Sequence, residues 1–462
     1  MIVLTGRLVR ALLHLRIVLH LCYLARPSAR LRPLTVVLVA MWALSACQDA
    51  ERMKIADAGT WKDPSDRSGV RTFCELPGSV QYTAAGVVTV PGPEGAPSVS
   101  FLQVPTGFCA HYFARLGNAR QLRFAPGGEL FVASPTTSTT GGGPGGWQAV
   151  VILIDDNQNG YADEPITFLS GLPSTQGMLF APGYFYYQDH TRILRRPYRP
   201  GERQPSEPAE LMADINYYAS ALHWPKTLDQ ADDGTIYVGN GGDQGELCDP
   251  AGPMRGGIFK LDGSPGGAAV AKGLRNAIAV RCQRGHNLCF ASELARDYSA
   301  DIGGREKLLP IREGDDWGFP CCATHDLPFP DVSPSPDCSN VVPEAVSFVI
   351  GDTPFSFDFE PGNWAAPYTG SVFIPLHGVA GSWVGARIVA VAVDPMTGVL
   401  LPGTTIAGTA TGAMSDFASG WDDGLRAHGR PAALAFSADG RLFVANDTNG
   451  DILWIAPIGL ER

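Results

Sequence analysis

Short apolar segments that follow a glycine-containing turn recur along the chain. Six of them, each with an aromatic residue, occupy residues 127–133, 183–187, 233–239, 286–292, 370–375 and 439–445. The first four begin roughly 50 residues apart, which is long enough for four short strands. The 54 glycines and 37 prolines favour tight turns, and long amphipathic helical stretches are few. This pattern predicts an all-β fold, a six-bladed β-propeller with inserted loops such as 300–345.

A second pattern precedes four of these segments. A polar residue stands ahead of a strand that ends in a turn, in residues 119–126, 175–182, 224–231 and 430–437. The innermost strand of a propeller blade begins beside the central channel, so we expect these polar residues to face the axis. Residues 80–105 contain two further alternating apolar runs. We expect them to supply the strand that closes the ring.

The N-terminal segment has the layout of an export signal. Arg26, Arg30 and Arg32 precede the apolar run 34–43, and small residues lead to Cys47. The run is short for a membrane-spanning helix. The residues before Cys47 resemble the lipobox of bacterial lipoproteins, and an ordinary signal peptide is the alternative.

The resulting division of the chain has three parts. We expect residues 1–46 to be a removed leader, residues 47–75 a polar tether and residues 76–462 the propeller. Lipidation of Cys47 implies an exported protein of the cell envelope or periplasm, anchored to a membrane by its lipid.

Eight of the ten cysteines follow Cys47, and an even set in an exported protein favours disulfides. Cys282 is well placed to pair with Cys289 across a hairpin, and either Cys321 or Cys322 can reach Cys338. No pair of cysteines has the CxxC spacing that is typical of a zinc site. The formal net charge of −11 argues against a nucleic-acid surface, since phosphate binding needs clustered basic residues.

Five phrases of the sequence resemble the glucose and sorbosone dehydrogenase family, in the same order along the chain. They are residues 223–228, 273–276, 314–322, 368–378 with 382–383, and 428–431. The resemblance runs from about residue 110 to the C-terminus. It implies a six-bladed propeller that binds pyrroloquinoline quinone and calcium and oxidises a sugar or sugar aldehyde.

The resemblance also implies roles for particular residues. His223 corresponds to the general base, and a histidine suits this role because its pKa lies near neutrality. Arg275, Asn276 and Arg430 correspond to cofactor ligands, since a guanidinium matches a carboxylate. His377 stands where the sorbosone-like branch has a histidine. Each arginine can instead belong to a structural ion pair, and His223 can be a core histidine bonded to backbone.

Two departures from the family pattern concern the cofactor site. Asn276 is followed by Ala277 rather than proline. The acidic loop after Glu293 keeps Asp297, Asp301 and Glu306 but not the family's order. These departures leave open whether the site still binds calcium with the cofactor.

A separate loop has the spacing of an oxygen-rich calcium site. Oxygen ligands at its first, third, fifth, seventh and ninth positions, with glycine at the sixth, match such loops, although Ile166 replaces the terminal glutamate. The expected ligands are Asp155, Asn157, Asn159, Tyr161 and Asp163. An Asx-rich turn without metal is the alternative.

Three functions therefore remain open. The first is a quinone-dependent dehydrogenase of a small carbohydrate or aldehyde, which passes electrons to an external acceptor because the chain has no CxxCH haem motif. The second is a propeller that only binds a partner or a glycan. The third is a calcium-dependent lactone hydrolase, whose mark is a Glu-Asn-Asp cluster on the axis.

Overall fold

The computed structural model describes residues 71–137, 145–215, 223–242, 248–249, 256–378, 384–424 and 427–462, without the side chains of 297–298. The leader, Cys47 and most of the expected tether lie outside these residues. In the described part, the two helices are short 3-10 turns, η1 (Phe73–Glu75) and η2 (Asp297–Ile302). None of the described helices is long and apolar enough to cross a membrane.

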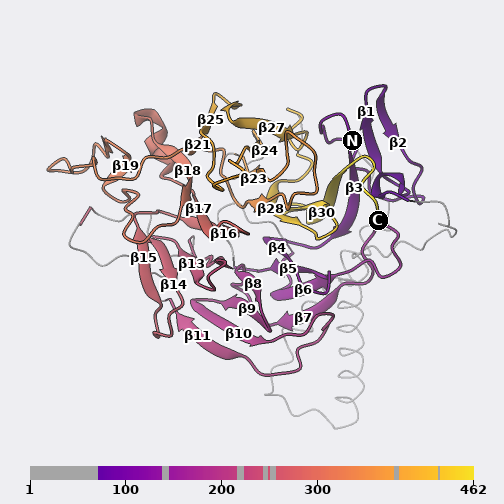
Figure 1. Ribbon diagram of the computed structural model, residues 1–462, viewed down its shortest axis with the longest axis horizontal. Coiled ribbons are helices and arrows are strands. Elements are labelled where there is room, and N and C mark those ends of the chain that lie inside the picture. The colour runs from indigo at the N-terminus through magenta and orange to yellow at the C-terminus, as the bar shows by residue number, and fades with distance from the viewer. Residues whose placement is uncertain are drawn as a thin grey trace, which may run out of the picture. The chain divides into compact units, whose positions relative to one another are not determined.

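Six sheets surround a central channel, which confirms the predicted fold class (Figure 1). Blades 1 to 3 are regular four-stranded antiparallel sheets. Blade 1 is β4 (Gln121–Phe124), β5 (Leu130–Ser134), β6 (Ala149–Leu153) and β7 (Ile166–Ser170). Blade 2 is β8 (Met178–Ala181), β9 (Tyr184–Asp189), β10 (Arg192–Pro197) and β11 (Glu210–Asp214). Blade 3 is β12 (Leu228–Gln230), β13 (Ile236–Asn240), β14 (Gly257–Lys260) and β15 (Ala268–Lys272).

A hairpin that leaves blade 5 extends the sheet of blade 4. Blade 4 is β16 (Ala277–Gln283), β17 (Leu288–Glu293), β18 (Arg305–Pro310) and β21 (Val346–Val349), and its insert carries the small ribbon β19 (Cys322–Thr324) and β20 (Leu327–Pro328). Blade 5 is β22 (Asp358–Phe359), β23 (Val372–Leu376), β24 (Arg387–Val391) and β27 (Met414–Ala418). The hairpin β25 (Gly403–Ile406) and β26 (Thr409–Gly412) leaves blade 5 and extends the sheet of blade 4 through a parallel pairing.

Blade 6 closes the ring by joining the two ends of the chain. It consists of β28 (Pro431–Phe436), β29 (Leu442–Asn446), β30 (Asp451–Pro457) and β3 (Phe108–Arg115). The expectation that residues 80–105 supply the closing strand is wrong, because β1 (Val80–Thr83) and β2 (Gly86–Thr89) lie outside β3 in this sheet. All of β2 is exposed, whereas β3 is buried at every position but its last, as an internal strand must be.

The six recurring phrases of the sequence are the second strands of the six blades. In every blade a glycine with positive φ precedes this strand: Gly128, Gly183, Gly234, Gly285, Gly370 and Gly440. At Gly183 and Gly234 an added Cβ would meet no atom within 4 Å, so the left-handed backbone and not lack of space requires glycine there. This turn chemistry is what made the blades visible in the sequence.

Each gap between neighbouring blades contains its own apolar cluster. Phe131 and Phe185 pack between blades 1 and 2, and Phe348 and Phe357 pack between blades 4 and 5. Six large clusters of this kind occupy the six interfaces of the described residues. The core is therefore a ring, and burial of these side chains supplies its main stabilisation.

Two arginines tie the inner strands together across the channel. The guanidinium of Arg281, on blade 4, donates to the carbonyls of Leu122, Leu434 and Phe357, at distances of 3.3, 3.2 and 3.1 Å. Arg123, on blade 1, donates to the carbonyls of Met178 and Leu228 at 2.8 and 2.7 Å. These two side chains connect all six blades.

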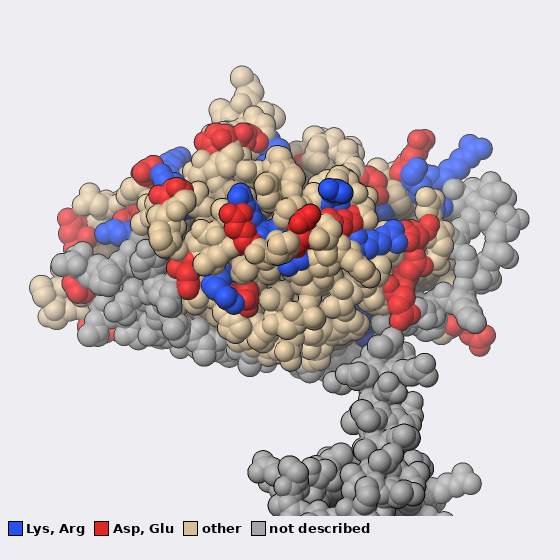
Figure 2. All heavy atoms as spheres, turned by 90° about the horizontal axis from the view of Figure 1, so that it is seen from below, with Lys and Arg blue, Asp and Glu red and all other residues tan. Residues whose placement is uncertain are grey.

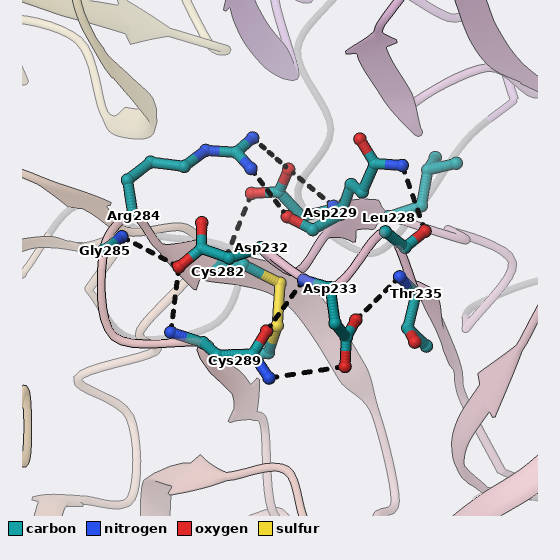
Figure 3. Close-up of a disulfide and its surroundings, with 12 residues drawn as sticks. Leu228, Asp229, Asp232, Asp233, Thr235, Cys282, Arg284, Gly285 and Cys289 are labelled. Atoms are coloured by element: carbon teal, nitrogen blue, oxygen red, sulfur yellow. Dashed lines mark hydrogen bonds and ion pairs between the residues drawn. A yellow bond between two sulfur atoms is a disulfide. The ribbon is translucent and has the colours of Figure 1, made fainter.

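We call the end of the channel where the inner strands finish the lower end. There, a disulfide between Cys282 and Cys289 staples the hairpin of β16 and β17 (Figure 3). Asp232 of blade 3 accepts hydrogen bonds from the backbone N–H groups of Gly285 and Asn287, at 2.8 and 2.9 Å. The hairpin tip is therefore latched onto the neighbouring blade.

The other disulfides fix segments outside the blades. Cys322 pairs with Cys338, so both pairings expected from the sequence are confirmed. The remaining disulfides join Cys74 to Cys109 and Cys248 to Cys321. Phe73 and Cys74 are buried, so the residues just before position 76 already pack on the propeller.

The charged side chains on the surface are intermixed. On the face seen in Figure 2, acidic and basic residues lie next to one another among uncharged atoms. Ion pairs such as Arg195 with Glu210, at 2.9 Å, are of this kind. Exposed pairs contribute little to stability, so the polar groups of interest are the buried ones.

Candidate functional site at the upper end of the channel

We call the opposite end of the channel, where the inner strands begin and the second strands finish, the upper end. Loops from every blade meet there, and several buried polar side chains occupy it. Five residues are assigned to the cofactor or base by the family resemblance. Arg275, Asn276 and Arg430 directly precede inner strands, His223 lies in the loop that leads to β12, and His377 follows the second strand of blade 5. All five are at least 93% buried. The structure therefore places them at one end of the channel.

His223 has a defined tautomer. Its Nδ1 lies 2.5 Å from the carbonyl oxygen of Gly242, so Nδ1 carries the proton and donates it. The basic lone pair is then on Nε2. The backbone N–H of Gly242 in turn donates to the carbonyl of Arg275 at 2.6 Å, which links this loop of blade 3 to blade 4.

Gly241 separates His223 from Asn276. A Cβ added to Gly241 would lie 2.5 Å from the Cβ of His223 and 3.3 Å from Oδ1 of Asn276. Glycine at this position therefore permits the two side chains to flank one peptide segment. The sequence places these residues 53 positions apart, and the structure brings them together.

The side-chain oxygen of Asn276 is buried without a hydrogen-bond partner among the described residues. Leaving a buried polar atom unpaired costs about 1–3 kcal/mol. Other buried polar atoms share this property, and an acceptor of this kind pairs with a hydrogen-bond donor from a water molecule or a ligand.

Arg275 is held by main-chain groups of blade 4. Its Nη1 donates to the carbonyls of Leu294 and Ala295 at 3.2 and 2.7 Å. Its backbone N–H donates to Oε1 of Glu293 at 3.0 Å. The guanidinium is thus fixed in direction next to Asn276.

Arg430 and His377 meet around a carboxylate that sequence reasoning missed. Asp447 is fully buried, and its carboxylate contacts Arg120 at 2.5 Å, His377 at 3.0 Å and Arg430 at 3.2 Å. The guanidinium of Arg120 also stacks on Phe355, 4.2 Å from the ring centroid. Blades 1, 5 and 6 therefore contribute to one cluster, which we call the Asp447 cluster.

Burial and charge act in opposite directions within the Asp447 cluster. Burial alone would raise the pKa of Asp447, but His377, Arg120 and Arg430 together bring it well below its ordinary value. Burial lowers the pKa of His377 to about 4, and Asp447 offsets only part of this effect. At neutral pH the cluster thus combines two guanidinium cations, one carboxylate and a neutral imidazole.

The expected calcium ligands lie at the lower side of blade 1, opposite to the end that holds the Asp447 cluster. The loop joins β6 to β7, and the Asp155 carboxylate accepts the N–H groups of Asn159 and Gly160, both at 2.7 Å. Asp163 accepts the N–H of Asp156 at 2.8 Å and the Nδ2 of Asn157 at 2.7 Å. The side chain of Tyr161 is buried. These hydrogen bonds join the side chains and main chain of one loop, and the calcium site stays a prediction.

The carboxylates after Glu293 do not converge in the same way. Glu306 is buried, and it accepts the N–H of Thr353 at 2.5 Å, whereas Asp301 is exposed. Across the residues described, no group of three or more His, Cys, Asp or Glu side chains is arranged to hold a metal. The axial carboxylate cluster that a lactone hydrolase needs gains no support from these residues.

A cavity of about 390 Å³ lies among the loops of blades 4 and 5. Asp352, Gly385, Arg387 and Asp422 are among the residues that line it. The carbonyl of Asp352 accepts the N–H of Gly378, the residue after His377. The cavity is therefore adjacent to the upper end and large enough for a small molecule.

The sequence carried weak signals for the residues that were missed. Arg120 occupies the leading polar position of the phrase 119–126, and Asp447 follows the second strand of blade 6. Lys226, which is discussed below, holds the same position ahead of β12. The expectation that leading polar residues face the axis thus covers Arg120, but it assigns no chemistry to this residue.

Comparisons with known proteins support the fold. No family model and no curated protein matches the sequence. The chain is similar in structure to an iodide form of a Trichoderma reesei enzyme of carbohydrate-active family AA12, with 17% identity and a TM-score of 0.60 over 79% of this chain and 100% of that one.

Two further solved structures are also similar to this chain. One is the holo form of the pyranose dehydrogenase PQQ domain from Coprinopsis cinerea, with 18% identity and a TM-score of 0.61 over 79% of this chain and 99% of that one. The other is the apo form of a soluble aldose sugar dehydrogenase from Escherichia coli, with 12% identity and a TM-score of 0.54 over 76% and 99%. The chain has the six-bladed propeller fold of these carbohydrate-active and sugar-oxidising proteins.

Proposed function

We propose that the protein is an oxidoreductase that uses pyrroloquinoline quinone to oxidise a sugar or sugar aldehyde at the upper end of the channel. The observation that carries this proposal is that His223, Arg275 and Asn276 lie together at the upper end, where the buried Oδ1 of Asn276 has no partner among the described residues. The dehydrogenases that share the fold agree with it.

The residues present suit this cofactor chemically. Pyrroloquinoline quinone is a flat tricarboxylate, and guanidinium, imidazole and amide groups are the donors that carboxylates prefer. Arg275 and Asn276 would hold it from blade 4, while His377 and Arg430 would hold it from blades 5 and 6. When bound, the quinone accepts the two electrons that leave the substrate carbon.

His223 acts as the general base in this proposal. Because Gly242 holds the proton on Nδ1, Nε2 is the atom that would accept the hydroxyl proton of a substrate. The hydrogen bond also stabilises the imidazolium that forms, since a carbonyl oxygen accepts from it in both protonation states. His223 therefore needs no rearrangement between its two states.

Calcium enters the proposal as a structural ion. The loop with Asp155, Asn157, Asn159, Tyr161 and Asp163 offers carboxylate, amide and carbonyl oxygens, the ligands that calcium prefers. One solved structure with this fold is a calcium form of the AA12 enzyme. Because the loop lies at the lower end, the ion would stabilise blade 1 and take no part in the reaction.

A non-catalytic binding propeller is the second candidate. Arg430 and Arg120 form ion pairs with Asp447, and His377 hydrogen-bonds to it, so these side chains already form an internal structural cluster. A cluster of this kind can persist after redox chemistry has been lost. The cavity lined by Asp352 and Arg387 would then bind a glycan or another small ligand.

We further propose that the protein works outside the cytoplasm, tethered through a lipid on Cys47. Four disulfides support an oxidising compartment. Electrons would pass to a separate protein or a soluble mediator. Loss of the protein from the membrane fraction in a Cys47→Ala variant, with retained export, is the expected result, and unchanged membrane association would overturn the anchor.

The activity is tested with purified protein incubated with pyrroloquinoline quinone and calcium, using aldoses and an electron-accepting dye. Sugar-dependent dye reduction is expected, and His223→Gln should lower kcat by about 100-fold or more, as is typical for loss of a general base. His286→Gln, a histidine on the β16–β17 hairpin at the lower end, is the matched control. Quinone binding without any turnover would favour the binding propeller.

A further inference from the structure

Lys226 is a buried cation with few partners. The side chain is 1% exposed, and among the described residues its ammonium makes one hydrogen bond, to Oδ1 of Asn240 at 2.6 Å. An ammonium has three N–H donors, so burial with one acceptor is unfavourable. Lys307, also buried, shows the usual alternative, with Glu293 at 3.4 Å and the carbonyls of Ala323 and Trp317 at 3.0 and 3.5 Å.

Asn240 connects Lys226 to the segment that holds His223. Since Lys226 takes the amide oxygen of Asn240, the amide nitrogen points the other way and donates to the carbonyl of Gly241 at 3.3 Å. The next carbonyl, that of Gly242, accepts the Nδ1 proton of His223. The lysine thus sets which end of the amide faces the glycine segment.

The backbone around Lys226 is held rigidly from blade 2. The Oε1 of Gln188 accepts the N–H of Lys226 at 3.0 Å, and its Nε2 donates to the carbonyl of Trp224 at 2.8 Å. A Cβ on Gly177 would lie 1.9 Å from the carbonyl oxygen of Lys226. The loop segment that carries His223 and Lys226 is therefore fixed, and the glycine segment 241–242 is the part that the amide must orient.

The electrostatics around Lys226 agree with this geometry. Burial lowers the pKa of Lys226 to about 8, and Asp214, at the end of β11, offsets part of the effect. Gln188 and Asn240 face the lysine as neutral groups. The ammonium is thus charged at neutral pH and loses its proton under mildly alkaline conditions.

We propose that Lys226 is a positioning residue, which orients the Asn240 amide and thereby the Gly241–Gly242 segment that fixes the tautomer of His223. The role assigned to His223 as a base rests on the proposed function, whereas the control of its tautomer does not. Lys226 is not among the residues assigned to the base or to the quinone.

The test is 15N NMR of the imidazole nitrogens in apo protein labelled at histidine, with the His223 signals identified by their loss in His223→Gln. Wild type should show a protonated Nδ1 and a basic Nε2. Lys226→Met should give a mixture of tautomers, and Lys226→Gln, which keeps one donor, should restore the wild-type pattern. Lys272→Met, a half-exposed lysine of blade 3, is the matched control.

Two outcomes overturn the inference. One is an unchanged His223 tautomer in both Lys226→Met and Asn240→Leu, and the other is the same shift in the Lys272→Met control. Enzyme assays with the quinone add a second readout, in which Lys226→Met should lower kcat by about 10-fold with little change in KM. A shifted tautomer in a protein that oxidises no sugar would sink the proposed function and leave the positioning role standing.

Discussion

The two ends of the channel use buried basic residues in opposite ways. At the lower end, Arg281 and Arg123 donate to main-chain carbonyls of neighbouring blades. At the upper end, Lys226 has one acceptor in the described residues, Asn276 has an unpaired oxygen there, and two guanidiniums share Asp447 with a histidine. A well-bonded cation stabilises the fold, whereas a poorly bonded one marks a place where stability has been given up for binding or reaction.

The largest expected effect is at the lower end. Arg281→Met removes the donor for three carbonyls of the inner strands and should lower the free energy of unfolding by about 3–5 kcal/mol. Denaturant unfolding measures the change. Arg284→Met, in which the lost side chain is largely exposed, is the control and should change it by about 0.5 kcal/mol or less. Equal effects of the two substitutions would show that the carbonyl contacts of Arg281 do not stabilise the fold.

The Asp447 cluster should give the next largest loss. Asp447→Asn leaves two buried guanidiniums without their carboxylate and should cost about 3 kcal/mol at pH 7. The pKa of Asp447 is lowered in the folded state, so its contribution is present above the unfolded value of about 3.9 and is lost as pH falls. The difference in the free energy of unfolding between wild type and variant should therefore be smaller at pH 3 than at pH 7. A difference that stays constant with pH would show that Asp447 is not stabilised as an anion.

The disulfide of the β16–β17 hairpin should contribute less. Its cysteines are only seven residues apart, and closing so short a loop accounts for about 2 kcal/mol. Replacing both Cys282 and Cys289 by serine should lower the unfolding free energy by that amount. The hydrogen bonds to Asp232 should keep the hairpin in place, so quinone binding should be unchanged. Loss of quinone binding in this variant would mean that the lower end affects the structure of the upper end.

The smallest effect has the opposite sign. Lys226→Met removes a poorly partnered buried charge and should raise the free energy of unfolding by about 1–2 kcal/mol at pH 7. Because the folded pKa of Lys226 is lowered to about 8, the penalty for burying it is full below pH 8 and disappears as pH rises toward its unfolded value of about 10.4. The advantage of the variant should shrink over that range. A less stable variant would place Lys226 among the structural cations.

The sequence predicted the blades well because their signals are local. A glycine turn and an apolar second strand lie within one phrase, so each of the six phrases marked a blade, and the Cys282–Cys289 hairpin followed from the same reasoning. The closing strand was misplaced because β1 and β3 are both apolar, and only their burial in the assembled sheet distinguishes them.

The site was predicted only in part, because its contacts are not local. Asp447 meets Arg120 across 327 positions of the chain, and no spacing rule connects blades 1 and 6. The same holds for Cys74 with Cys109 and for Cys248 with Cys321, whose pairings depend on how the loops cross the blades. Arg275, Asn276 and Arg430 could be predicted because they belong to phrases that resemble the family.

The central claim is that the upper end of the channel is a ligand site for a quinone tricarboxylate. Calorimetric titration of the purified protein with pyrroloquinoline quinone at millimolar calcium tests it most directly, with Asn276→Leu beside Asn287→Leu, an asparagine on the latched hairpin at the lower end. The account predicts saturable binding in wild type and Asn287→Leu and binding at least 10-fold weaker in Asn276→Leu. No binding in wild type, or equal binding in all three proteins, would contradict it.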